Sequence, residues 1–167
     1  SSTHGTPPRA AQAGAASALA DYVVLTGDAR ARETLVALLG ALRSRSLPIG
    51  KSPVQSAIEK TGLLGLPAGR YKLRKLLGHF GLVYRPEGPG RVLSPNRGYG
   101  DAHTGATALA LLAEVRYVRG GGDERFADDR RAWLEALIGL RISGLGFRQT
   151  ADSIDHHDYY DGEAWLA

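Results

Sequence analysis

Residues 52–80 read SPVQSAIEKTGLLGLPAGRYKLRKLLGHF and carry the clearest secondary-structure signals in the chain. Ser52 is a suitable helix N-cap, Pro53 fits the first helical turn, and Gln55 stands three residues after the cap. This combination is a capping box with proline at the first helical position. It predicts a short helix that ends at Gly62.

A second helix is predicted from Pro67 to about Phe80. Its apolar residues recur at i, i+3, i+4 and i+7, which places them on one face. They are Leu73, Leu76, Leu77 and Phe80. The opposite face is basic, and such a density of cations repels itself unless a polyanion is nearby. The candidate nucleic-acid-binding residues of this helix are Arg70, Tyr71, Lys72, Arg74 and Lys75.

Further elements are predicted on both sides of these two helices. Leucines at helical spacing predict an amphipathic helix over residues 28–44. Two short β-type runs, 82–85 and 91–94, flank a Pro/Gly-rich loop at 86–90, which predicts a β-hairpin. Cations near the second helix and beside the hairpin loop can contact phosphates. They are Lys51, Arg85 and Arg91.

Three helices followed by a hairpin resemble a winged helix-turn-helix module, and the resemblance covers residues 28–94. The turn from Gly62 to Leu66 is longer than the tight turn of many helix-turn-helix units. The resemblance implies that the basic helix docks in the major groove of duplex DNA, with the hairpin against the backbone or minor groove. RNA stays an alternative to DNA. A protein-interaction winged helix, or a merely solvated basic face, is the competing interpretation.

The charge distribution favours a polyanionic partner. The chain has a net charge of +4, but residues 30–97 hold 13 Lys or Arg against 3 Asp or Glu, a net +10. Residues 101–167 hold 7 Arg against 12 acids, a net −5, and residues 1–29 contribute −1. A local charge of +10 is typical of a surface that binds nucleic acid.

We therefore expect a mainly α protein with a small β-hairpin, divided into three parts. Residues 1–20 are expected to form a flexible tail, and residues 21–97 the winged-helix module. Residues 101–167 are expected to form an acidic helical segment, with helices over 107–118 and 123–141, and its expected role is to regulate binding or to dimerise. The residues expected to pack on the module or form a homodimer are Trp133, Leu137 and Ile138.

An enzyme is the weaker alternative. Seven acidic and histidine residues crowd into the C-terminal segment, yet their spacing matches neither a calcium loop nor a zincin helix. They are Asp152, Asp155, His156, His157, Asp158, Asp161 and Glu163. The chain contains no Gly-rich phosphate loop and no serine elbow. We therefore expect a non-enzymatic protein without a cofactor, and a solvated acidic end.

The composition excludes several other classes. Without cysteine, the chain cannot form disulfides, thiolate zinc sites or a cysteine nucleophile. No stretch approaches the ~20 apolar residues that span a bilayer, and the first residues lack the apolar run of a secretory signal. These features predict a cytoplasmic protein that does not associate with membranes.

Overall fold

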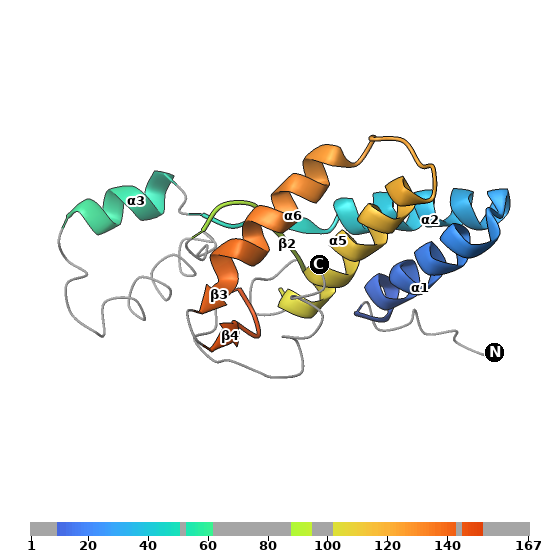
Figure 1. Ribbon diagram of the computed structural model, residues 1–167. Coiled ribbons are helices and arrows are strands. Elements are labelled where there is room, and N and C mark those ends of the chain that lie inside the picture. Colours follow the sequence, from blue (N-terminus) through green and yellow to red (C-terminus); the bar gives the residue numbers. More distant parts are fainter. Residues whose placement is uncertain (1–9, 51–52, 62–87, 95–101, 143–144, 152–167) are drawn as a thin grey trace, which may run out of the picture.

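A computed structural model describes residues 10–50, 53–61, 88–94, 102–142 and 145–151 (Figure 1). Several predicted features lie outside these residues. They are the basic helix over 67–80, the first hairpin strand at 82–85, and the acidic and histidine cluster at 152–163. The described part confirms a mainly helical protein with a small antiparallel sheet.

Four helices form the body of the protein, namely α1 (Ala10–Thr26), α2 (Ala29–Arg43), α5 (Thr104–Arg119) and α6 (Ala127–Leu140). Helix α1 runs alongside α5, and α2 and α6 pack around the same core (Figure 1). None of the described helices is long and apolar enough to cross a membrane. The largest side chains that the body buries completely include Leu35, Leu39, Leu111, Trp133 and Leu140.

Helix α1 replaces most of the expected flexible tail. Residues 10–20 are helical, and the buried side of α1 consists mainly of alanine. Alanine has the highest intrinsic helix propensity, and its small side chain allows two helices to approach closely. The partner helix α5 is also rich in buried alanine. The buried small residues of α1 are Ala13, Ala16, Ala20 and Ser17.

The small sheet joins two segments that are distant in sequence. Strand β1 (Ser46–Pro48) follows α2, and it pairs antiparallel with β2 (Arg91–Leu93). Beyond the last pair, Ile49 N donates to Gly90 O at 3.0 Å. The sequence predicted no strand between the helix over 28–44 and the helix that begins after Ser52, so β1 was not predicted. Helix α3 (Pro53–Lys60) follows β1 and lies apart from the body (Figure 1).

The described C-terminal residues complete the body rather than forming a separate unit. A small hairpin follows α6. Its strands, β3 (Arg141–Ile142) and β4 (Gly146–Phe147), have two residues each. The backbone then returns to the start of α5, where Thr104 N donates to Gln149 O at 3.1 Å. One hydrophobic core contains residues of α1, α2, β2, α5 and α6. The first helix of the predicted module therefore shares its core with the acidic helical segment.

Candidate nucleic-acid interface

The predicted interface consists of eight residues, and the structure describes Arg91 among them. The other seven lie outside the described residues. They are Lys51, Arg70, Tyr71, Lys72, Arg74, Lys75 and Arg85. What the structure does establish is the place from which the basic segment leaves the body and to which it returns.

We call this place the neck, and it consists of strands β1 and β2 together with residues 49–50 and 88–90, which adjoin them. Gly50 and Gly88 adopt φ values of +118° and +141°, which favour glycine. A Cβ atom on Gly50 would lie 3.0 Å from Gly88 O. Glycine at positions 50 and 88 therefore suits both the backbone conformation and the close approach of the two chain segments.

Gly90 fixes the neck against α6. Its φ is +89°, and a Cβ atom would lie 2.5 Å from Ala136 N and still closer to Ala132 O. Pro89 packs beside Gly139, one turn further along α6. Residues 88–90 were expected to belong to a projecting hairpin loop. They lie instead on the body, because glycine at position 90 lets the backbone approach the helix directly.

Arg91 also belongs to the neck. Its side chain is only partly exposed, and Nη2 donates to Ser46 O at 2.6 Å across the β1–β2 pair. Its charge also acts on Asp129, a buried carboxylate of α6 that lies 3.3 Å from Arg43 Nε. Burial raises the pKa of Asp129, and the charges of Arg43 and Arg91 oppose that shift. In this structure Arg91 therefore serves the attachment of β2, and its predicted phosphate contact stays untested.

Buried hydrogen bonds tie both strands of the neck to the helices. Trp133 Nε1 donates to Ser46 Oγ at 2.8 Å, and Ser46 Oγ donates to Leu42 O at 3.3 Å. On the other strand, Leu93 N donates to Thr107 Oγ1 at 3.0 Å. Trp133 was expected from the sequence to pack on the module or to form a homodimer. The polar role of its indole nitrogen could not be predicted, because the acceptor is on β1.

A second polar cluster links α5 to α6. Glu114 is fully buried, and Arg130 Nη1 lies 2.9 Å from its Oε1 atom. Arg130 Nη2 donates to Glu124 Oε2 at 2.6 Å. Burial raises the pKa of Glu114 to about 7, although the adjacent Arg130 charge opposes the rise. This cluster is a structural ion pair within the helical body.

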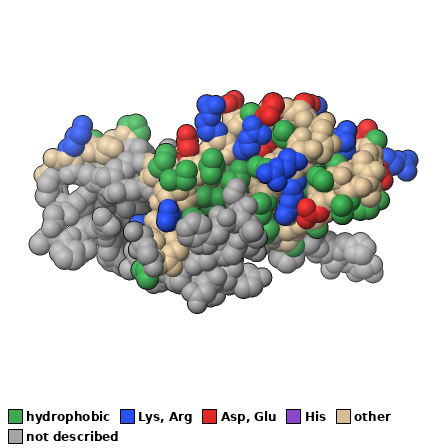
Figure 2. All heavy atoms as spheres, in the orientation of Figure 1, with side chains coloured by type: hydrophobic (Ala, Val, Ile, Leu, Met, Phe, Trp, Pro, Cys, Tyr) green, Lys and Arg blue, Asp and Glu red, His purple; other side chains and the backbone are tan. Residues whose placement is uncertain are grey.

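The described surface of the body carries charges of both signs. In Figure 2, Lys and Arg side chains lie among Asp and Glu side chains over α6 and its neighbours. One cleft of about 410 Å³ includes Arg32, Asp123 and Arg125 in its lining. Arg32 Nη2 donates to Gly120 O at 2.8 Å, while Arg125 binds the Asp123 carboxylate through two nitrogens. These charges are engaged with one another or with backbone, so the cleft does not offer a concentrated site for an anion.

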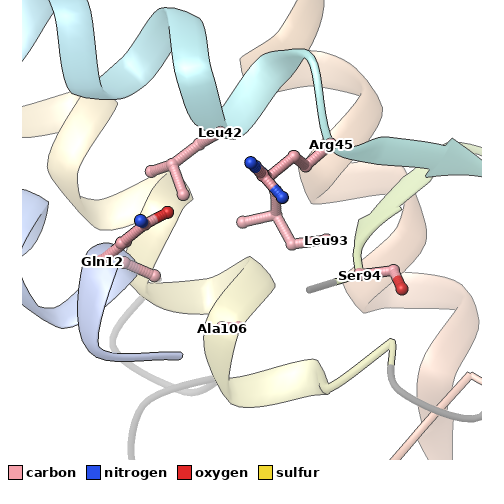
Figure 3. A pocket seen from close by; sticks show the side chains of 7 residues that line it. Gln12, Leu42, Arg45, Leu93, Ser94 and Ala106 are labelled. Atoms are coloured by element: carbon pink, nitrogen blue, oxygen red, sulfur yellow. The ribbon is translucent and has the colours of Figure 1, made fainter. Parts of the chain in front are cut away.

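A second cavity in the described part is very small. A cavity of about 10 Å³ lies where α1, α2, β2 and α5 meet, beside Leu42, Arg45 and Leu93 (Figure 3). Such a volume is close to the minimum that holds one water molecule. Among the described residues, no group of three or more His, Asp or Glu side chains is placed to bind a metal ion.

Comparison of the chain with protein families, with curated proteins and with solved structures finds no match.

Proposed function

We propose that the protein binds duplex nucleic acid, and DNA in particular, through the basic segment between the two sides of the neck. Residues 50–89 hold seven Lys or Arg against two Asp or Glu, a net charge of +5. The observation that carries the proposal is the hydrogen bond from Ile49 N to Gly90 O, which brings the ends of this segment together. Both ends of the basic segment are therefore attached to the body at the same place.

A single attachment point suits electrostatic recognition of a polyanion. Each phosphate that Lys or Arg neutralises releases counterions, so a local concentration of cations gives affinity for any duplex. A helix that reads the major groove must also be held at a defined angle. The fixed attachment of the two segment ends supports this proposal, because the strands of the neck bond to α2, α5 and α6. The order α2, β1, α3 and returning β2 is compatible with the resemblance to a winged helix-turn-helix module.

A protein partner is the second candidate, and the position of Arg91 favours it. This guanidinium faces the backbone of Ser46, and residues 88–90 pack on α6. One part of the expected DNA-binding hairpin therefore has a structural role. A winged-helix module without a DNA-contacting hairpin can serve as an interaction module, because the fold alone does not determine function.

A salt titration tests the proposal. The full chain is titrated into labelled duplex DNA, single-stranded DNA and duplex RNA of the same length, from about 50 to 300 mM salt. We expect duplex DNA to bind most tightly and its affinity to fall steeply as salt rises. Undetectable binding to several duplex sequences at about 50 mM salt would favour the protein-partner candidate instead.

A further inference from the structure

A second charged segment begins beside the neck. Ala151, the last described residue, is fully buried in a small hydrophobic cluster. The same cluster contains Ile49 and Val92, which belong to the neck. Ala151 N also donates to Ala102 O at 3.0 Å, which fixes its place on the body. The chain therefore enters residues 152–167 from a point beside the attachment of the basic segment.

Residues 152–167 carry a charge opposite to that of the basic segment. They lie outside the described residues, and their sequence holds five Asp or Glu and no Lys or Arg, a net charge of −5. The basic segment, residues 50–89, has a net charge of +5. Aspartates at every third position spread the negative charge along the acidic segment, namely Asp152, Asp155, Asp158 and Asp161. The two segments are therefore equal in charge and opposite in sign.

A short chain is enough to bring these charges together. Ten residues separate Ala151 from Asp161, and an extended chain of that length covers at most about 36 Å. A tether of this kind holds its charges around the attachment point at an effective concentration in the millimolar range. At about 0.1 M salt, exposed charges attract each other mainly within about 10 Å, so proximity decides which charges meet. The shared attachment beside the neck provides that proximity.

We propose that residues 152–167 occupy the basic segment when no nucleic acid is bound and thereby inhibit the binding proposed above. This regulation rests on the proposed function, because the carboxylates take the place of phosphates and neutralise the same lysines and arginines. Duplex DNA carries one negative charge per about 1.7 Å of its axis, so its charge density is higher than that of the acidic segment and it can displace the segment. Ligands with few phosphates have no such advantage. The competition takes place within one molecule, so it does not depend on protein concentration.

The lysines of the chain allow a direct test of this contact. All of them lie in the basic segment, namely Lys51, Lys60, Lys72 and Lys75. A carbodiimide joins a carboxylate directly to an amine, so a link between a lysine and residues 152–163 reports contact between the two segments. The full chain is treated in dilute solution without nucleic acid, and linked peptides are identified by mass spectrometry. A mixture of isotope-labelled and unlabelled chain separates links within one molecule from links between two.

We expect such links within single molecules at low salt. They should disappear at about 1 M salt, where the screening length falls to about 3 Å. Duplex DNA added at low salt should also suppress them, because phosphates then replace the carboxylates.

Two variants of equal net charge test the competition. One neutralises three aspartates of the acidic segment, and its control neutralises three exposed acids of the body. The first variant combines Asp155→Asn, Asp158→Asn and Asp161→Asn. The control combines Glu33→Gln, Asp128→Asn and Glu135→Gln. At about 50 mM salt we expect the first variant to bind duplex DNA about tenfold more tightly than the control, and at about 300 mM salt the difference should largely vanish.

Two results would overturn the proposal. One is the absence of links between the lysines and residues 152–163 at low salt. The other is a variant of the acidic segment that binds duplex DNA no more tightly than its control. If no form of the chain binds duplex DNA, the proposed function fails, and the links measured without nucleic acid still show whether the two segments touch. The two proposals therefore fail in distinguishable ways.

Discussion

Trp133 and Ser46 are 87 positions apart in sequence and are joined by a buried hydrogen bond of 2.8 Å from the indole nitrogen to the hydroxyl oxygen. The bond connects the middle of α6 to the first residue of β1. A buried polar pair of this kind has a strict geometry, since an unsatisfied partner is costly. It therefore fixes the position of the neck relative to the body.

The first prediction concerns this pair. Trp133→Phe removes the donor and part of the ring, and Ser46→Ala removes the acceptor. We expect each change to lower the free energy of unfolding by about 1–3 kcal/mol. Urea denaturation of both single variants and the double variant forms a double-mutant cycle. The two losses should add to clearly more than the loss in the double variant. Simple additivity would mean that the hydrogen bond contributes nothing of its own.

The second prediction concerns Gly90. Gly90→Ala should destabilise the protein by more than about 3 kcal/mol, because it combines an unfavourable backbone conformation with a clash against α6. Gly27→Ala is the matched control. Gly27 has a φ of +67°, and nothing lies within 4 Å of a Cβ atom built there. Its cost in urea denaturation should be that of the backbone alone, about 1–2 kcal/mol. Equal losses at the two positions would show that Gly90 does not pack on α6 as described.

The third prediction concerns pH. The pKa of Glu114 is about 7 in the folded protein, raised by burial from an ordinary value of 4.5. The folded state therefore binds a proton more tightly than the unfolded state does, and stability falls as pH rises from about 4.5 to about 7. Above that range the loss is complete. Burial also raises the pKa of Asp129, which adds a loss of the same sign.

Glu114→Gln tests this dependence, because glutamine does not titrate. Chemical denaturation at pH 5 and pH 8 should show a larger decrease in the unfolding free energy for the unmodified protein than for the variant. Glu124→Gln is the control, since Glu124 contacts the same Arg130 but is exposed. That variant should retain most of the pH dependence, because burial raises the pKa of Glu114 more than the charge of Glu124 does. If Glu114→Gln retains it as well, another group is responsible.

The fourth prediction concerns the proposed interface. Arg74→Ala combined with Lys75→Ala should weaken binding to all duplex sequences and leave the fold intact. Each lost phosphate contact should reduce the salt slope by about one. Arg119→Ala combined with Arg131→Ala removes the same charge from exposed positions of the body. Fluorescence titrations of the two double variants separate a local site from a general effect of net charge. Equal weakening would contradict a site on the basic segment.

Helical periodicity predicted the body well where leucine gives contrast. The spacing of Leu35, Leu39 and Leu42 places them on one face of a helix, and all three are buried in α2. Helix α1 escaped prediction because its buried residues are mostly alanine, which differs little from its exposed neighbours in hydrophobicity. The high helix propensity of alanine nevertheless favours a helix in this stretch.

Strand β1 escaped prediction for a different reason. A strand of three residues that includes Pro48 is stable only when it is paired, and its partner β2 begins more than 40 positions later. Trp133 is buried and Ile138 is exposed, and this difference likewise depends on which helices surround α6. For the candidate interface, the concentration of positive charge could be predicted from the sequence. The structure shows the neck and the position of Arg91.

The neck gives the chain the architecture of an insertion. The segment between Ile49 and Gly90 starts and ends at adjacent points of one small sheet, so its length can change without moving the strands that flank it. The entropy of closing a loop grows only slowly with its length. Natural variants can therefore lengthen, shorten or exchange this segment and retain the helical body. The inserted segment and the helical body are thus free to diverge at different rates within a single polypeptide.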